Sequence, residues 1–183
     1  MKTAEERNTR ILIIDDNEAI HSDFAKILAS HNKANDELDS LESNLFDDDT
    51  SPDAERQVFD LESAIQGKEG FEKVIEAVEE GKPFAFAFVD MRMPPGWDGL
   101  ETIQHLWSAD SDLLVVICTA YSDYTWEDLQ QRLERADQLM LLKKPFGNIE
   151  VQRLAADLTK KWNRIQEANE FTTDNPIGHE GGA

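Results

Sequence analysis

The stretch FAFAFVDMRMPPGWDG, residues 84–99, decides the fold of this chain. It opens with an apolar run rich in Phe, which is typical of a buried strand and is too short to span a membrane. The run ends on one carboxylate, Asp90, and a loop rich in Pro and Gly follows it. Ligands bind at the carboxyl ends of the strands in open α/β sheets, so we expect Asp90 to project into such a crevice.

Four further segments predict strands on either side of this stretch. The run LLVVIC, residues 113–118, is almost uninterrupted, as expected for a strand that is covered on both faces. Residues 10–14 and 138–142 are shorter apolar runs, and residues 58–64 alternate apolar and polar side chains. Apolar residues between the strands recur at helical spacing. They predict five helices, over residues 17–30, 71–80, 100–107 and 126–133 and from about Asn148 onward.

Five strands that alternate with five helices predict an α/β fold, with a parallel sheet, right-handed crossovers and helices on both faces. Asp98 is placed to cap the third helix, and Asp16 or Asn17 to cap the first. We expect one domain at residues 10–165 after an N-terminal extension at residues 1–9. No helical pattern continues beyond Asn169, so residues 166–183 are predicted to be a disordered tail or the start of a linker to an output domain.

An acidic insert at about residues 31–57 separates the first predicted helix from the second strand. Connections in such folds usually have about 2–6 residues, so this segment is unusually long. We predict a solvated loop, with a short helix around residues 36–45, packed loosely outside the domain, as the alternative. The triplet at residues 47–49 lacks the spacing of an EF-hand loop, which favours the solvated loop over a calcium site.

The negative net charge of the chain argues against two kinds of partner, nucleic acids and anionic membranes. Eighteen Lys and Arg against 38 Asp and Glu give a formal charge of −20, which repels nucleic acid phosphates and anionic membrane surfaces. We therefore expect no direct nucleic acid binding and no membrane partner. No apolar run is long enough to span a bilayer, and residues 1–10 lack the apolar core of a signal peptide, so we expect a cytoplasmic protein. Cys118 lies in an apolar run and is expected to be buried.

Polar residues follow four of the five predicted strands: Asp15 and Asp16, Asp90, Thr119, and Lys144. Taken singly, Asp15, Asp16, Thr119 and Lys144 are better explained as caps, turns or solvated strand ends, and Asp90 fits a structural or a functional role equally well. Their joint placement at one sheet edge favours a site. Crowded carboxylates repel one another unless a cation joins them, and oxygen ligands favour a hard ion such as Mg²⁺. With Thr119 and Lys144 on the other oxygens of a metal-bound phosphoryl group, Asp90 is placed to attack phosphorus.

Over about residues 10–162 the chain resembles the receiver domain of bacterial two-component response regulators. The resemblance implies a flavodoxin-like (βα)5 fold with strand order 2-1-3-4-5. The motifs that carry it are Asp15 with Asp16, Asp90 within DMRMP and ahead of a DG pair, Thr119 with Ala120, and Lys144-Pro145-Phe146.

The resemblance also implies roles for these residues. Asp90 is expected to accept a phosphoryl group from a histidine kinase or phosphotransfer protein, with Mg²⁺, or Mn²⁺ or another divalent ion, as cofactor. Asp16, Asp90 and the backbone carbonyl of Arg92 are expected to bind the ion directly, and Asp15 through water. Thr119 and Lys144 are expected to sense the phosphoryl group. The region of helix four, strand five and helix five would then pass the signal to an output domain or effector, and it is a plausible homodimer surface.

Three features depart from the family pattern. The loop after Asp90 is one residue longer than usual before its DG pair, and the acidic insert is an addition. Leu141 stands where the family often has the aromatic residue of the switch, which Tyr121 could replace. Arg92 and Tyr121 flank the site and are predicted to modulate the lifetime of the phosphoryl group.

Two other functions are open. One is a receiver-like interaction module that is not phosphorylated. The other is a phosphatase of the haloacid dehalogenase type, whose nucleophile follows the first strand with a second Asp two residues on. Here Asp15 and Asp16 are adjacent and residue 17 is Asn, which argues against the phosphatase. We expect no turnover of a separate substrate.

Overall fold

The computed structural model describes residues 7–29, 58–120 and 124–174. These residues contain a five-stranded parallel sheet with the order β2-β1-β3-β4-β5, which confirms the predicted flavodoxin-like architecture. The strands are β1 (Arg10–Ile14), β2 (Asp60–Ala64), β3 (Phe86–Asp90), β4 (Leu114–Thr119) and β5 (Leu139–Lys143).

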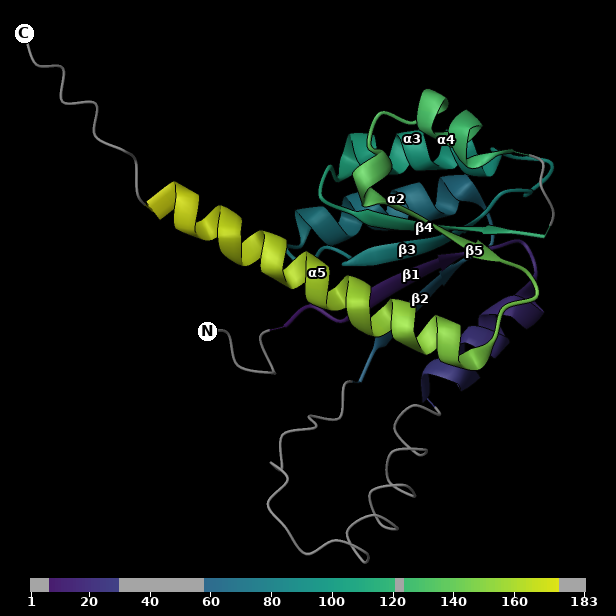
Figure 1. Cartoon of the computed structure of the whole chain (residues 1–183), viewed down its shortest axis with the longest axis horizontal. Helices are drawn as coiled ribbons and strands as arrows, with labels where there is room; N and C mark the ends of the chain where they lie inside the picture. The colour runs from purple at the N-terminus through teal and green to yellow at the C-terminus, as the bar shows by residue number, and fades with distance from the viewer. Residues whose placement is uncertain (1–6, 30–57, 121–123, 175–183) are drawn as a thin grey trace, which may run out of the picture.

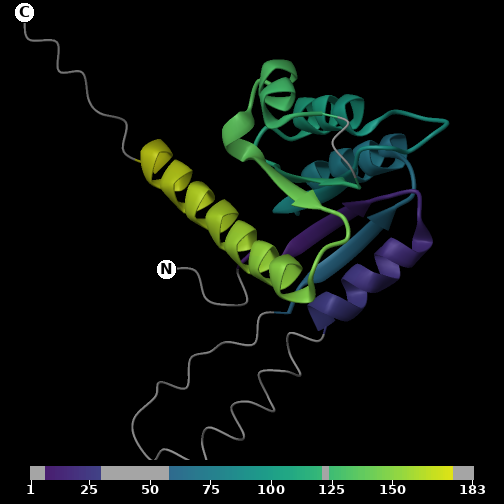
Figure 2. The ribbon, with the colours of Figure 1, turned by 45° about the vertical axis from the view of Figure 1, so that its right-hand side comes forward.

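Helices cover both faces of the sheet (Figure 1). On one face lie α2 (Gly67–Glu79), α3 (Gly99–Ala109) and α4 (Trp126–Arg132). The other face is covered by the helix at residues 18–29 and by α5 (Asn148–Asp174), as the turned view also shows (Figure 2). A short 3-10 turn at Ala136–Gln138 precedes β5. No helix in the described part of the chain is long and apolar enough to cross a membrane.

The two faces of the sheet divide the core into two layers. Along β3, Ala87 and Val89 pack into the layer under α2 and α3, whereas Phe86 and Phe88 pack into the layer under α5. All four side chains are at most 1% exposed. This two-sided burial explains why β3 is an uninterrupted apolar run that ends only at Asp90.

Helix α2 begins at Gly67, four residues before the start predicted from its apolar spacing. Gly67 and Gly70 lie inside the first turns of α2 and let this helix pack closely. A Cβ at Gly70 would lie 2.3 Å from the Ile14 side chain, and one at Gly67 would lie 2.1 Å from the Thr102 hydroxyl. Close packing against β1 and α3 therefore outweighs the low helix propensity of glycine.

Helix α5 continues to Asp174, so the prediction of disorder is wrong for residues 166–174, whereas the alternative, the start of a linker to an output domain, stays a prediction. Its first part is held by buried residues such as Val151, Leu158 and Trp162, and this anchored part nucleates further turns. The Thr172 hydroxyl donates to the carbonyl of Ala168 in the added segment. Figure 1 shows this end of α5 extending past the sheet. The predicted insert and the tail from residue 175 lie outside the described residues.

Candidate functional site

Three carboxylates meet at the carboxyl edge of β1 and β3. Asp15, Asp16 and Asp90 each offer one oxygen, and these oxygens all lie within 4.8 Å of one another. Asp15 is buried and Asp16 is exposed, while the side chain of Asp90 is 12% exposed. Asp90 is therefore largely enclosed but retains access to solvent.

Lys144 joins the acids from the other side of the edge. Its Nζ donates to Oδ2 of Asp15 at 2.9 Å and to Oδ1 of Asp90 at 3.2 Å. Its backbone N–H donates to the carbonyl of Thr119 at 2.8 Å, which fixes the turn after β5 beside the end of β4. The Lys144–Pro145 peptide bond is cis. One ammonium group thus links residues from β1, β3 and β5.

The Lys144 ammonium group only partly compensates the negative charge of the three carboxylates. Burial raises the pKa of Asp90 above its ordinary value, the charge of Asp15 raises it further, and the ammonium of Lys144 opposes both effects. Burial by itself lowers the pKa of Lys144, but its hydrogen bond to Asp15 and the charges of both acids outweigh burial, so that pKa is raised. An additional cation at these oxygens would relieve the remaining repulsion.

The polar residues in the turn after β1 make different contacts. Oδ1 of Asp15 accepts from the N–H of Asn17 at 2.9 Å, and Oδ1 of Asn17 accepts from the N–H of Ala19 at 3.0 Å. Asn17 therefore caps the helix at residues 18–29, which decides between the two capping residues that the sequence left open. Asp16 does not cap this helix, and its carboxylate belongs to the acidic group.

Gly99 brings the loop after β3 back against the strand end. Its N–H donates to the carbonyl of Met91, and a Cβ at this position would lie 2.7 Å from the backbone oxygen of Asp90. The N–H of Gly96 donates to the carbonyl of Met93, which closes the turn that contains the additional residue. Arg92 is exposed between the buried side chains of Met91 and Met93. The loop thus places Arg92 two residues after Asp90, at the same edge of the sheet.

Thr119 is the last residue of β4 and is half-buried. Cys118 pairs with Asp90 in the register of β3 and β4, so Thr119 lies one residue further along the same edge. Leu141 on β5 is partly buried and packs against the core under α2, α3 and α4. Tyr121 lies outside the described residues, and its predicted role stays a prediction.

Sequence reasoning did not single out Tyr124. Its ring packs against the same core as Leu129, and the guanidinium of Arg132 lies 5.2 Å from the ring centroid. Thr125 and Asp128 form a reciprocal capping box at the start of α4. Tyr124 and Leu129 hold the two apolar positions that flank such a box, which is a local signal for a hydrophobic staple.

The residues present fit a hard divalent cation. All three acidic ligands offer carboxylate oxygen, the donor that Mg²⁺ prefers, and one of them is exposed enough to leave room for water ligands. A neighbouring ammonium group and a strand-end hydroxyl add two groups that can bind phosphoryl oxygens. The arrangement can therefore hold a phosphoryl group next to a carboxylate nucleophile.

Comparison with known proteins finds similar folds among solved structures. An adenylate cyclase structure from Rhodopirellula baltica is 22% identical with a TM-score of 0.58, and the match covers 92% of this chain and 99% of that one. A CheY-like response regulator receiver domain protein from Methanospirillum hungatei JF-1 is 18% identical with a TM-score of 0.59, over 86% and 98% of the two chains. NtrX from Brucella abortus is 16% identical with a TM-score of 0.62, over 94% of this chain and 31% of that one.

No protein-family model and no curated protein sequence matches the chain. Most of the structural neighbours are response regulator receiver domains, so the chain has the receiver fold. This likeness lies below 25% identity and concerns the fold alone. The function therefore has to be argued from the residues at the carboxyl edge of the sheet.

Proposed function

We propose that this chain is a phosphoacceptor receiver domain and that Asp90 takes the phosphoryl group. The observation that carries the proposal is the meeting of Asp90 with Asp15, Asp16 and Lys144 at one edge of the sheet. Structural neighbours with the same fold include receiver domains, which supports a signalling role over turnover of a separate substrate.

Asp16, Asp90 and the backbone carbonyl of Arg92 would hold Mg²⁺, or Mn²⁺ or a similar ion, directly. Asp15 would act through water, because its two oxygens already accept hydrogen bonds from the Asn17 N–H and from Lys144. When bound, the ion supplies positive charge that offsets the crowded acids and orients phosphoryl oxygens.

Phosphorylation would proceed by attack of an Asp90 carboxylate oxygen on phosphorus. A new O–P bond forms while the bond from phosphorus to the donor breaks, and the donor group departs with its bonding electrons. Lys144 would turn its ammonium group to the transferred phosphoryl oxygens, and the Thr119 hydroxyl would donate to another of them. The side chain of Asp90 is 12% exposed, which supports access by a donor histidine.

Loss of the contact between Lys144 and Asp90 would carry the signal outward. Thr119, Tyr121 and Leu141 would form the switch region, since Leu141 is only partly buried on β5. The donor would be a histidine kinase or phosphotransfer protein in the cytoplasm. The receiver of the signal would be an output domain or effector, an assignment supported by the match to one third of the longer NtrX chain. The region of α4, β5 and α5 is the surface we assign to a homodimer.

The test is incubation of the protein with acetyl phosphate, or with beryllofluoride, in the presence and absence of Mg²⁺. We expect a Mg²⁺-dependent phosphoryl adduct by intact mass spectrometry, located at Asp90 by peptide mapping and lost in Asp90→Asn. Turnover of added phosphate esters would instead indicate a phosphatase. No adduct and no beryllofluoride binding, in a chain that remains folded, would indicate an interaction module.

Arg92 and Tyr121 are proposed to set the lifetime of the adduct by shielding it from water. Replacing both residues with Ala should change the dephosphorylation rate while the adduct still forms. An unchanged rate would remove both residues from this role.

A further inference from the structure

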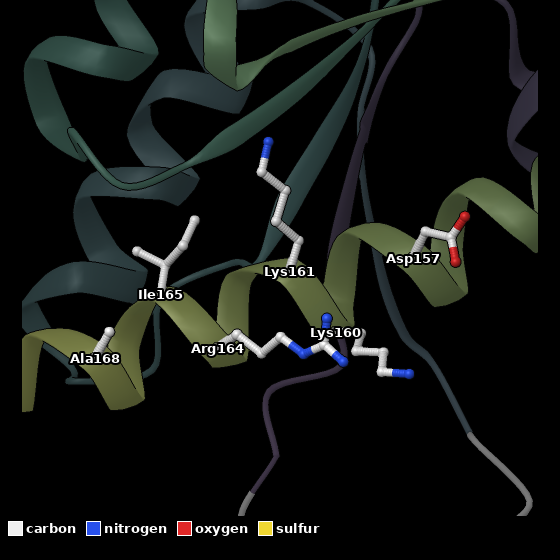
Figure 3. A pocket seen from close by; sticks show the side chains of 6 residues that line it. All are labelled: Asp157, Lys160, Lys161, Arg164, Ile165 and Ala168. Atoms are coloured by element: carbon white, nitrogen blue, oxygen red, sulfur yellow. The ribbon is translucent and has the colours of Figure 1, made fainter.

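The outer face of α5 carries a basic and apolar surface that the proposed phosphorylation site does not use. Lys160, Lys161 and Arg164 line an open hollow of about 560 Å³ together with Asp157, Ile165 and Ala168 (Figure 3). One turn further along the helix, the ring of Phe171 is 82% exposed. Successive members of this set are three or four residues apart and form a band along α5, in which Lys160 and Arg164 are exposed and Lys161 and Ile165 lie beside the buried Leu158 and Trp162.

Among the residues that the structure describes, no acid forms an ion pair with the cations of this α5 surface. The Lys161 ammonium donates to the carbonyl of Asp137. Lys160 and Arg164 form no hydrogen bond or ion pair within the described residues, and Figure 3 shows their side chains extending to the side of α5 away from Lys161. In a chain of net charge −20, an acidic segment is therefore the complementary partner of this surface.

We propose that residues 36–49 of this chain, which lie outside the described residues, are that partner. The segment has seven Asp or Glu and no Lys or Arg. It also carries Leu38, Leu41 and Leu45 at intervals of three and four residues. Acidic side chains would face Lys160 and Arg164, and the leucines would cover the apolar part of the hollow near Ile165, Ala168 and Phe171.

The fold places the attachment of this segment beside the α5 surface. The N–H of Asp60 at the start of β2 donates to the carbonyl of Thr9. The next residue back, Asn8, exchanges two hydrogen bonds of 2.9 Å with the side chain of Asn163 on α5. The chain therefore enters β2 next to the turn of α5 that lies between Lys160 and Arg164.

The length of the connection allows the contact. Residues 50–58 can span about 30 Å when extended, whereas Lys160 lies only about 4.5 Å along the helix axis from Asn163. A tether of this length holds the segment at an effective concentration of roughly millimolar. Several weak exposed charge pairs then act together, although each contributes little by itself.

Carbodiimide cross-linking of the full chain at low salt, followed by peptide mass spectrometry, tests the proposal. We expect cross-links from Lys160 or Lys161 to acids in residues 36–49 that exceed those from Lys68, an exposed lysine of α2, and that fall at high salt. Because Lys161 remains available, Lys160→Glu with Arg164→Glu should reduce its cross-links by about tenfold. Lys68→Glu is the matched control and should leave them unchanged.

A mixture of ¹⁵N-labelled and unlabelled chain identifies the occupant. Cross-links within one copy support the proposal. Cross-links between labelled and unlabelled copies would overturn it in favour of a second copy, and cross-links no more frequent than those of Lys68 would overturn it altogether. The readout does not require phosphorylation of Asp90, so it stands or fails separately from the proposed function.

Discussion

The two sides of the carboxyl edge are built differently. The acid side, residues 10–16 and 86–99, is closely packed: Val89, Met91 and Met93 are at most 5% exposed, and Gly99 contacts the Asp90 backbone. The β5 side, residues 124–147, is covered less completely, although Leu133, Leu139 and Leu142 are buried. Its helix α4 has seven residues and buries only Leu129 among them, and Met140 on β5 is 39% exposed.

The two sides suit different tasks: the acid side fixes the positions of carboxylates, and the β5 side is suited to a change of conformation. Carboxylates that bind a cation need fixed positions, which the dense packing of the acid side provides. An element that responds to a ligand needs low local stability, which few buried contacts provide. Lys144 belongs to the β5 side and reaches both Asp15 and Asp90. This ammonium group is thus a direct polar contact between the two sides, in addition to the sheet and the core that they share.

Removing the Lys144 ammonium group should have the largest effect on the free energy of unfolding. Lys144→Met leaves Asp15 buried without its cation, and we expect the free energy of unfolding in urea to fall by about 3 kcal/mol. Lys143→Met, on the exposed neighbour, should change it by less than about 0.5 kcal/mol. Equal effects of the two substitutions would show that the sides are not joined through Lys144. Mg²⁺ should stabilise the Lys144→Met variant more than the parent protein.

Substitutions at Gly99 and Gly147 test directly whether the acid side is packed more closely than the β5 side. A Cβ at Gly99 would meet the Asp90 backbone at 2.7 Å, so Gly99→Ala should lower the free energy of unfolding by about 1–3 kcal/mol. Nothing lies within 4 Å of a Cβ at Gly147 on the β5 side, so Gly147→Ala should be within about 0.5 kcal/mol of the parent. A loss at Gly147 as large as that at Gly99 would contradict the difference in packing.

Substitutions at the N-terminal caps of α3 and α4 test the same difference between the two sides, with smaller expected effects. Asp98→Ala removes the acceptor for the Glu101 N–H and should lower global stability by about 1 kcal/mol, because α3 is part of the core. Thr125→Ala removes one half of the α4 capping box. We expect it to speed hydrogen exchange in residues 126–132 with little change in global unfolding. A global loss matching that of Asp98→Ala would show that α4 is held as firmly as α3.

The pH dependence of stability should show the smallest effect. The pKa of Asp90 is raised in the folded state by burial and by Asp15, so folding favours its protonated form. Its contribution to stability is present below the ordinary carboxyl pKa and is lost as pH rises through the raised folded value. Asp90→Asn should therefore flatten that part of the pH profile and raise stability at pH 7. A profile unchanged by Asp90→Asn would contradict the raised pKa.

Much of the fold could be read from local sequence. Apolar runs specify β1, β3 and β4 because these central strands are buried on both faces, and polar residues follow them, and also follow β5, at the carboxyl edge. That rule places Asp15, Asp90, Thr119 and Lys144 at one edge before any contact is known. The roles assigned to these residues remain predictions that the adduct experiment tests.

Other features depend on contacts between elements that are distant in sequence. The early start of α2 at Gly67, the close approach of Gly99 to Asp90 and the double hydrogen bond of Lys144 depend on how the elements pack. Local periodicity reports whether a residue is buried, but it does not report the distance to residues on another strand or helix. The sequence by itself determined the type and order of the elements and the residues at the strand ends. Tertiary packing alone decided which atoms meet, because those distances arise only when the elements assemble.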